Sequence, residues 1–146
     1  MRLELWLRGE LPDGQLVENA RRSVHWAVVQ RLVNAEQQRA AGLLWVALDE
    51  AHQPAPPVFT SPVAIQWDVH YPAAVEATKK RAAKRGQKAV DWDGIVAALK
   101  PWQDMMVKQG WFKNDSAVYI PSGTVRVFNQ SKLGPAMRLT IEEVGG

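Results

Sequence analysis

The chain has 146 residues, of which 47% are hydrophobic and 23% are charged, and its formal net charge at pH 7 is +3. These values are typical of one globular domain with a buried core, which we expect to span residues 1–146. The absence of cysteine excludes disulfides, thiolate catalysis and Cys-type zinc sites. No apolar run approaches the ~18 residues of a membrane span, so we expect no membrane partner.

The first segment, "MRLELWLRGELPDG", carries charges throughout and lacks the apolar core of a secretory signal, which favours a cytoplasmic protein. Within it, Leu3, Leu5 and Leu7 alternate with polar residues and predict a half-buried strand. From about Asn19 to Asp49 the apolar residues follow helical spacing, which predicts one long helix.

The second half of the chain alternates strand-like and helix-like patterns. "VAIQWDVHY" at 63–71 predicts a strand, and the basic residues 72–90 predict a mobile loop. "DGIVAALKPWQDMMVKQG" predicts a helix ended by Gly110, in which Pro101 marks a kink or the first turn of a second segment. Three short strands then follow, "SAVYI", "TVRVFNQ" and "AMRLTIEEV". We expect an α+β fold, a two-layer sandwich in which helices cover one face of a mixed sheet.

Four aspartates in the second half are candidate site residues. If the chain is extended from Asp91 to Asp93, the two carboxylates project to the same side and can share one cation such as Mg²⁺. Lys100 and Asp104 follow Asp93 by seven and eleven residues, which places them within about 20° of it around a helix. Asp115 precedes a predicted strand, where site residues collect. A polar stripe of this kind is more often solvated surface.

The charge of the chain is concentrated ahead of these acids. Six of the 18 Lys and Arg residues fall in ten positions: Lys79, Lys80, Arg81, Lys84, Arg85 and Lys88. Such a block suits contact with phosphates, because neutralised phosphates release counterions. An ordinary solvated loop or helix face is the alternative.

The motif set "DWDG…LKPWQDMM…GWFKNDSAV", with the basic run before it, resembles the RusA-type Holliday-junction resolvases, including their prophage members. Asp91 and Asp93 match the D-x-D of that family, Lys100 matches its helical lysine, and Asp115 matches its last acid. Asp104 follows the lysine by four residues and precedes Asp115 by the family interval of eleven. Asn19, in "VENARRSVHW", fits the early part of the family pattern more loosely.

This resemblance implies a Mg²⁺-dependent endodeoxyribonuclease, with Mn²⁺ as an alternative metal. Asp91, Asp93 and Asp115 would hold the metal, Lys100 would contact the scissile phosphate or position the water, and Asp104 would have a supporting role. The basic run would follow the DNA backbone. The substrate would be branched DNA such as a four-way junction, and paired nicks would require a homodimer.

Two residues depart from the family pattern. Gly94 stands where the family has Asn, and Lys100 lies seven residues after the second aspartate, whereas the compact form of the motif has four. Both lysine spacings lie on the same helical face. The alternatives are a non-catalytic nucleic-acid-binding or architectural protein on the same fold, and a small α+β protein such as a phage assembly factor without a site.

Overall fold

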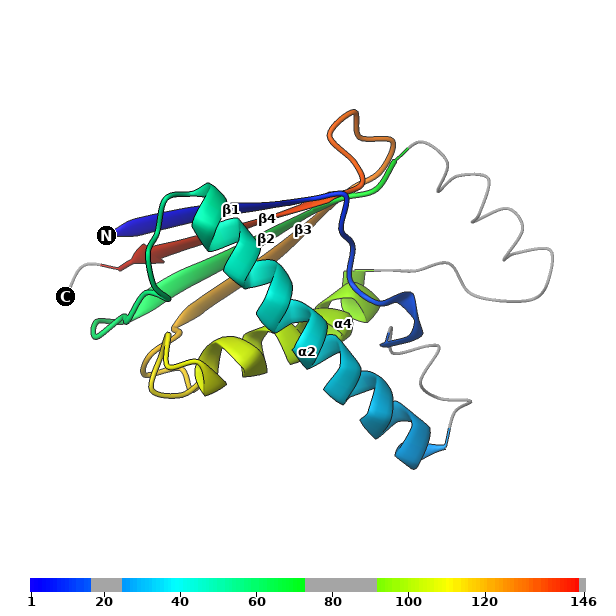
Figure 1. Cartoon of the computed structure of the whole chain (residues 1–146), viewed down its shortest axis with the longest axis horizontal. Helices are drawn as coiled ribbons and strands as arrows, with labels where there is room; N and C mark the ends of the chain where they lie inside the picture. Colours follow the sequence, from blue (N-terminus) through cyan, green and yellow to red (C-terminus); the bar gives the residue numbers. More distant parts are fainter. Residues whose placement is uncertain (17–24, 73–91, 145–146) are drawn as a thin grey trace.

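The structure is a computed structural model that describes residues 1–16, 25–72 and 92–144. Its elements follow the chain in this order: β1 (Arg2–Arg8), the 3-10 helix η1 (Gly14–Leu16), α2 (Trp26–Glu50), β2 (Val63–His70), α4 (Trp92–Lys108), β3 (Ser122–Phe128) and β4 (Ala136–Glu143). Both long helices lie on one side of the sheet (Figure 1). The fold is an α+β two-layer sandwich, as the sequence predicts.

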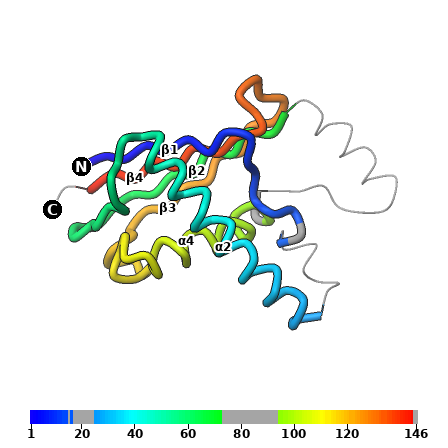
Figure 2. The backbone as a smooth tube through the Cα atoms, viewed as in Figure 1, coloured from blue at the N-terminus to red at the C-terminus, as the bar shows by residue number. Residues whose placement is uncertain are grey.

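The four strands form one mixed sheet in the order β1-β4-β2-β3. β4 is antiparallel to both of its neighbours, whereas β2 and β3 run parallel. Parallel neighbours need a long crossover connection, and α4 lies within the one that joins β2 to β3. Met1 and Glu143 lie at the same end of the sheet, where their charged groups are 3.0 Å apart (Figure 2).

Strand alternation divides the sheet into a core face and an open face. Leu3, Leu5 and Leu7 of β1 are buried against the helices, and the residues between them face the other way. β2 and β4 follow the same rule. The helices contribute these buried side chains to the core: Leu44, Leu48, Ile95, Leu99, Trp102 and Met106. Burial of this apolar surface, which stabilises the fold by about 25 cal/mol per Å², holds the two layers together.

The prediction of a strand at "SAVYI", residues 116–120, is wrong. The amide nitrogens of Tyr119 and Ile120 both donate to the Ser116 carbonyl, at 3.0 and 2.9 Å, so the segment folds as a local turn. These two amides are thus satisfied within the segment itself. Val118, which alternation would place in a sheet, is 68% exposed. β3 begins only at Ser122, and two strands rather than three complete the sheet.

α2 begins later than predicted, whereas α4 begins within one residue of the predicted start at Asp93. His25 has an extended backbone, and its Nδ1 accepts a hydrogen bond from the Ala27 amide, so α2 begins at Trp26 rather than near Asn19. α4 already includes Trp92 and Asp93, so the chain is not extended through Asp93 as the D-x-D argument supposed. Pro101 lies inside α4 without ending it.

A buried ionic network fixes α2 against α4 and η1. Glu36 is only 2% exposed and accepts hydrogen bonds from the Trp102 indole at 3.1 Å and the Asp13 amide at 2.8 Å. The Arg39 guanidinium also donates to it, at 2.6 Å from Nε. Burial would raise the pKa of Glu36, but these hydrogen bonds outweigh it and hold the pKa below its ordinary value. The helix that carries the candidate site is therefore firmly positioned.

Among the described residues, no helix combines the length and the apolar character that crossing a bilayer requires.

Candidate active site

The amphipathic character of α4 decides which side chains it exposes. Ile95, Leu99, Trp102 and Met106 are buried, and Trp102 packs edge-on against Trp67 of β2 with ring centroids 5.8 Å apart. With that stripe in the core, the helical positions on the other side remain at the surface. Lys100 and Asp104 occupy two such positions one turn apart.

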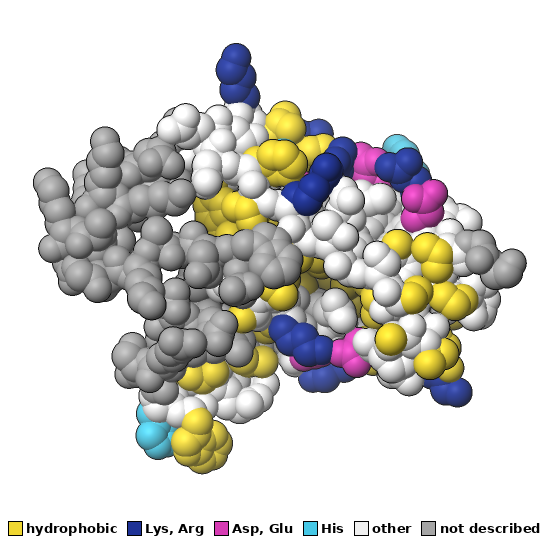
Figure 3. All heavy atoms as spheres, turned by 180° about the vertical axis from the view of Figure 1, so that it is seen from behind, with side chains coloured by type: hydrophobic (Ala, Val, Ile, Leu, Met, Phe, Trp, Pro, Cys, Tyr) yellow, Lys and Arg dark blue, Asp and Glu magenta, His cyan; other side chains and the backbone are white. Residues whose placement is uncertain are grey.

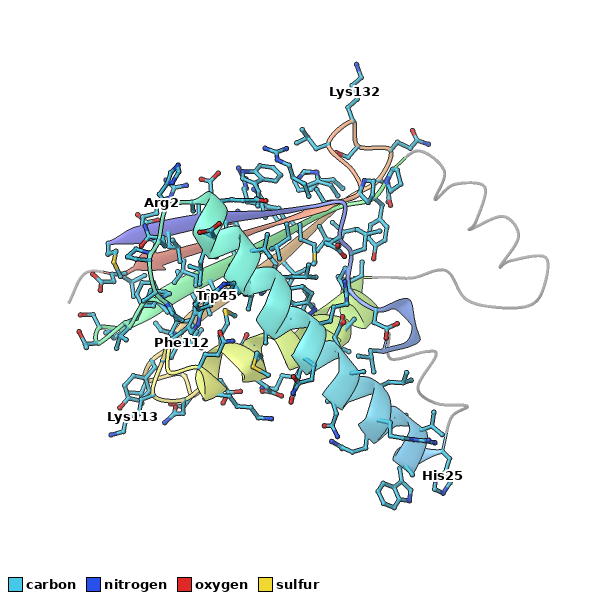
Figure 4. The ribbon with its side chains drawn as sticks, in the orientation of Figure 1. Arg2, His25, Trp45, Phe112, Lys113 and Lys132 are labelled. Carbon is cyan, nitrogen blue, oxygen red and sulfur yellow. The ribbon has the colours of Figure 1, made fainter. Side chains whose placement is uncertain are left out.

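The end of α4 turns the chain back along the helix. Gly110 has a φ of +81°, its amide bonds the Val107 carbonyl, and the Trp111 amide bonds the Met106 carbonyl at 3.0 Å. This pattern is a Schellman motif, and the predicted helix end at Gly110 is confirmed. Trp111 and Phe112 are then buried and anchor the loop to the core. Figure 4 shows Lys113 pointing away from the body just beyond Phe112.

This loop brings Asp115 to the exposed face of α4. The Lys100 ammonium donates to Oδ2 of Asp115 and lies 3.3 Å from Oδ1 of Asp104. The Asn114 side chain accepts a hydrogen bond from the Ser116 amide at 2.9 Å, which shapes the turn around Asp115. Three matched residues that are up to 15 positions apart in the sequence therefore form one cluster. In the view from behind, basic and acidic side chains lie side by side at the lower edge of the molecule, where α4 runs (Figure 3).

The cluster is partly solvated, and Lys100 and Asp115 keep each other charged. The side chains of Lys100, Asp104 and Asp115 are 53%, 36% and 39% exposed. The hydrogen bond to Asp115 raises the pKa of Lys100 above its ordinary value, and the pKa of Asp115 is lowered by the same contact. At neutral pH Lys100 is therefore a cation and cannot serve as a general base. It can hold an anion or orient a carboxylate.

The other predicted site residues are only partly described. The backbone of Asp93 lies in the first turn of α4, two turns before Lys100, but its side chain is not among those described. Asp91, Asn19 and the basic residues from Lys79 to Lys88 lie outside the described residues. Gly94 is described and is buried in α4.

The described donor set fits a divalent metal only in part. Among the side chains that the structure describes, which do not include that of Asp93, no three Asp, Glu or His side chains converge on a position that could hold a metal ion. Asp115 offers the oxygen ligands that Mg²⁺ prefers, but Lys100 engages this carboxylate. The backbone of Asp93 lies about 10.5 Å from that of Lys100 along the helix axis, toward the N-terminus, at 1.5 Å per residue. A metal shared by Asp93 and Asp115 would require Asp115 to leave Lys100.

The cluster lies on an open surface. A shallow groove of about 500 Å³ lies beside the same loop and is lined in part by Phe112, Lys113 and Tyr119, but Lys100 and Asp115 do not line it. Small-molecule sites are usually concave and largely apolar. An exposed charged site is better suited to a macromolecular substrate.

Sequence reasoning missed a second charged cluster, on the open face of the sheet. Asp68 of β2 is fully buried and is bound by the guanidinium groups of Arg126 and Arg138, each with a shortest contact of 2.6 Å. The signal was present in the alternation of "VAIQWDVH", which places Asp68 on the face opposite Trp67. The partners were not predictable, because they depend on the register of two distant strands.

No protein-family model matches the sequence, and no curated protein matches it.

Proposed function

We propose that this protein is a Mg²⁺-dependent, structure-selective endonuclease that resolves Holliday junctions or related branched DNA by paired nicks. The supporting observation is the cluster of Lys100, Asp104 and Asp115 on the exposed face of α4. The sequence spacing of these residues resembles the RusA-type pattern. Their contact in space is what a shared site requires, and the Asp93 position begins the same helix.

Under this proposal the carboxylates and the lysine have different tasks. Asp91, Asp93 and Asp115 would hold the metal, with Mn²⁺ as a possible substitute for Mg²⁺. The metal would supply an activated water and would stabilise charge on the phosphate. Lys100, protonated at neutral pH, would bind a non-bridging oxygen of the scissile phosphate once Asp115 is released from it. Asp104 would remain beside Lys100 and keep its ammonium in position.

The remaining parts of the proposal concern the substrate and the assembly. The basic run from Lys79 to Lys88 would contact the DNA backbone and recognise branched shape more than sequence. Two symmetric nicks in one junction require two active sites. We therefore propose a homodimer, because the described part of one chain carries one such cluster.

The experiment compares a labelled synthetic four-way junction with a linear duplex of the same sequence, each with Mg²⁺ and with EDTA. We expect paired nicks in the junction only, and only with Mg²⁺. Asp91→Asn and Asp93→Asn should each abolish cleavage, because each removes a charged metal ligand. Asp49→Asn, at an exposed position near the end of α2, is the matched control and should cleave like the wild type.

The other outcomes distinguish the alternatives. Junction binding without cleavage in any divalent metal would contradict the endonuclease and favour a non-catalytic, architectural DNA-binding protein. Absence of binding to either DNA would favour a small α+β protein without a nucleic-acid site. Cleavage that Asp91→Asn and Asp93→Asn leave intact would place the active site elsewhere in the chain.

A further inference from the structure

The open face of the sheet carries an ordered arrangement of arginines and aromatic rings. The strand registers place Trp6, Arg138, Asp68 and Arg126 in one row across all four strands. The next row toward the β3–β4 loop contains Arg8, Ala136, His70 and Phe128. These residues alternate with the buried core positions, so their side chains leave the sheet on the side away from α2 and α4.

Asp68 fixes the positions of two of these arginines. Arg126 donates to it through Nε and Nη2 at 2.6 and 3.0 Å, and Arg138 does so at 3.0 and 2.6 Å. Gln66 adds a weaker contact at 3.2 Å. Burial would raise the pKa of Asp68, but the two arginines outweigh it and lower the pKa. One carboxylate shared by two guanidinium groups leaves a net positive charge that is held rigidly.

The aromatic rings support the arginines from the side. His70 stacks on Phe128 with ring centroids 4.6 Å apart, and Trp6 lies 6.0 Å from His70 on its other side. The ends of this stack are covered by guanidinium groups, with Arg8 over Trp6 and Arg126 over Phe128 at 5.0 and 5.5 Å. The ring faces are therefore occupied. What the surface offers to a ligand is guanidinium N–H groups and not a platform for stacked bases.

Two further cations at this end of the face have no acidic partner in the part of the chain that the structure describes. Ser131 contacts the His70 ring at 2.9 Å, which folds the β3–β4 loop over the stack, and Lys132 projects from that loop away from the helices (Figure 4). Neither Arg8 nor Lys132 forms an ion pair with any residue that the structure describes. Among the described residues, the acids that pair with any of Arg8, Arg126, Arg138 and Lys132 are Asp68 and Glu4.

We propose that this end of the open sheet face binds the phosphate backbone of a nucleic acid. Arg8 on β1 and Arg126 on β3 are separated by three inter-strand spacings of about 4.8 Å, which is about 14 Å across the sheet. A DNA strand presents one phosphate per 3.4 Å of helix axis, so several phosphates span this width. A planar, preoriented guanidinium matches phosphate geometry. A protein partner is disfavoured, because the centre of a protein interface is depleted in charge, whereas this face is charged at its centre.

This surface goes beyond the proposed nuclease, since it needs no metal and lies on the sheet layer rather than on α4. The test uses the full chain, in EDTA, with a fluorescein-labelled linear duplex of ~20 base pairs, and follows affinity between roughly 50 and 200 mM salt. The test variant is Arg8→Gln/Lys132→Gln. Arg126 and Arg138 are left unchanged, because their loss would leave the buried Asp68 carboxylate without an ion-pair partner.

The matched control is Arg2→Gln/Arg31→Gln, which removes the same charge at the far end of the open face and on α2. We expect the test variant to lose two phosphate contacts. The slope of log affinity against log salt should become shallower by about 1.8, since each contact contributes about 0.9. At roughly 100 mM salt the affinity should fall about tenfold, whereas the control should stay within about twofold of the wild type.

Equal losses in the two double variants would overturn the proposal, because they would reflect overall charge alone. An unchanged slope in the test variant would also overturn it. So would a defect confined to vesicles of anionic lipid, with duplex binding intact. Junction cleavage by Arg8→Gln/Lys132→Gln at the wild-type level, with unchanged duplex binding, would leave the nuclease standing and refute this surface only. A shallower salt slope in Arg8→Gln/Lys132→Gln, in a protein whose wild type never cleaves the junction, would support this surface and refute the nuclease.

Discussion

Lys100 lies between two carboxylates on an exposed helix face, and this position restricts the chemistry that it can perform. Its contacts with Asp104 and Asp115 keep it protonated, so its role in any reaction is to attract or orient negative charge. Because all three side chains are partly solvated, the ion pairs contribute little to folding, typically less than about 1 kcal/mol each. A cluster with so small a structural role is a good candidate for a functional one.

Lys100→Gln should separate these two roles. We expect junction cleavage to fall about 100-fold, as when one charge-stabilising donor is removed from an active site. The free energy of unfolding, measured with urea, should change by less than about 1 kcal/mol. Junction binding in EDTA should stay near the wild-type level, because the basic run supplies most of the contacts in this proposal.

Lys108→Gln, two turns further along α4, is the control for this variant. Lys108 contacts Gln37 at 2.7 Å and no carboxylate among the described residues. It should therefore cleave like the wild type. If Lys100→Gln cleaved as well as Lys108→Gln, the cluster would have no part in the reaction.

At the scale of elements, α4 and the loop after it together position Asp115. The buried stripe of α4 sets which face is exposed, and Gly110 reverses the chain so that Asp115 returns to that face. Gly110 can adopt its φ of +81° without strain because it has no Cβ. A side chain at this position would strain both the helix end and the placement of Asp115.

Two Gly→Ala substitutions test this role of Gly110. A Cβ at Gly110 or at Gly42 would meet no atom within 4 Å, so the two sites differ in backbone conformation alone. Gly110→Ala should lower the free energy of unfolding by about 1–2 kcal/mol, because the left-handed conformation disfavours alanine. Gly42→Ala, inside α2, should raise it by about 0.5–1 kcal/mol. Thermal or urea unfolding of both variants measures the difference, and equal signs would contradict the assigned backbone conformations.

The sequence predicted the parts of these elements that depend on local pattern. Alternation identified β1 and β2, helical spacing identified the common face of Lys100 and Asp104, and the helix end at Gly110 followed from its conformational freedom. Each of these is decided by neighbours in the chain. The α+β class followed from the order of such segments.

The parts that failed depend on competition between local and distant partners. "SAVYI" has the composition of a strand, but the Ser116 carbonyl satisfies the Tyr119 and Ile120 amides in a turn. His25 caps α2 with a ring nitrogen, which helix propensity does not predict. The pairing of Asp68 with Arg126 and Arg138 required the strand registers, which no single segment contains.

At the scale of the whole molecule, the two layers carry different charged surfaces. The helix layer exposes the mixed cluster around Lys100, and the sheet layer exposes the arginines around Asp68. Between them lies an apolar core that joins Trp67 to Trp102. A branched DNA has several arms, and under the two proposals above each layer would contact a different one.

The stability of the molecule should depend on pH through His70. Burial is the main cause that lowers the pKa of His70, and the positive charges of Arg138 and Arg126 act in the same direction against Asp68. In the unfolded chain the pKa is near 6.5. The folded state thus takes up this proton at lower pH, so the contribution of His70 is complete above about pH 6.5 and is lost as the pH falls through the folded pKa.

We therefore expect the free energy of unfolding to fall as the pH decreases below about 6.5, with a contribution from one proton of at most about 1.4 kcal/mol per pH unit. His70→Gln should make this fall shallower, whatever its effect on stability at neutral pH. His52→Gln, which removes an exposed imidazole elsewhere in the chain, is the matched control. A His70→Gln slope equal to that of the wild type would show that His70 does not titrate differently in the folded state.

The most direct test of the proposed function is cleavage of a supercoiled plasmid that extrudes a cruciform. Paired nicks across the junction convert the plasmid to a linear molecule, whereas independent single nicks leave it circular. We predict a linear product from the wild type with Mg²⁺, and neither a linear nor a nicked product from Asp93→Asn. An intact supercoiled plasmid after incubation of the wild type with Mg²⁺ or Mn²⁺, or nicked circles alone, would contradict junction resolution by this protein.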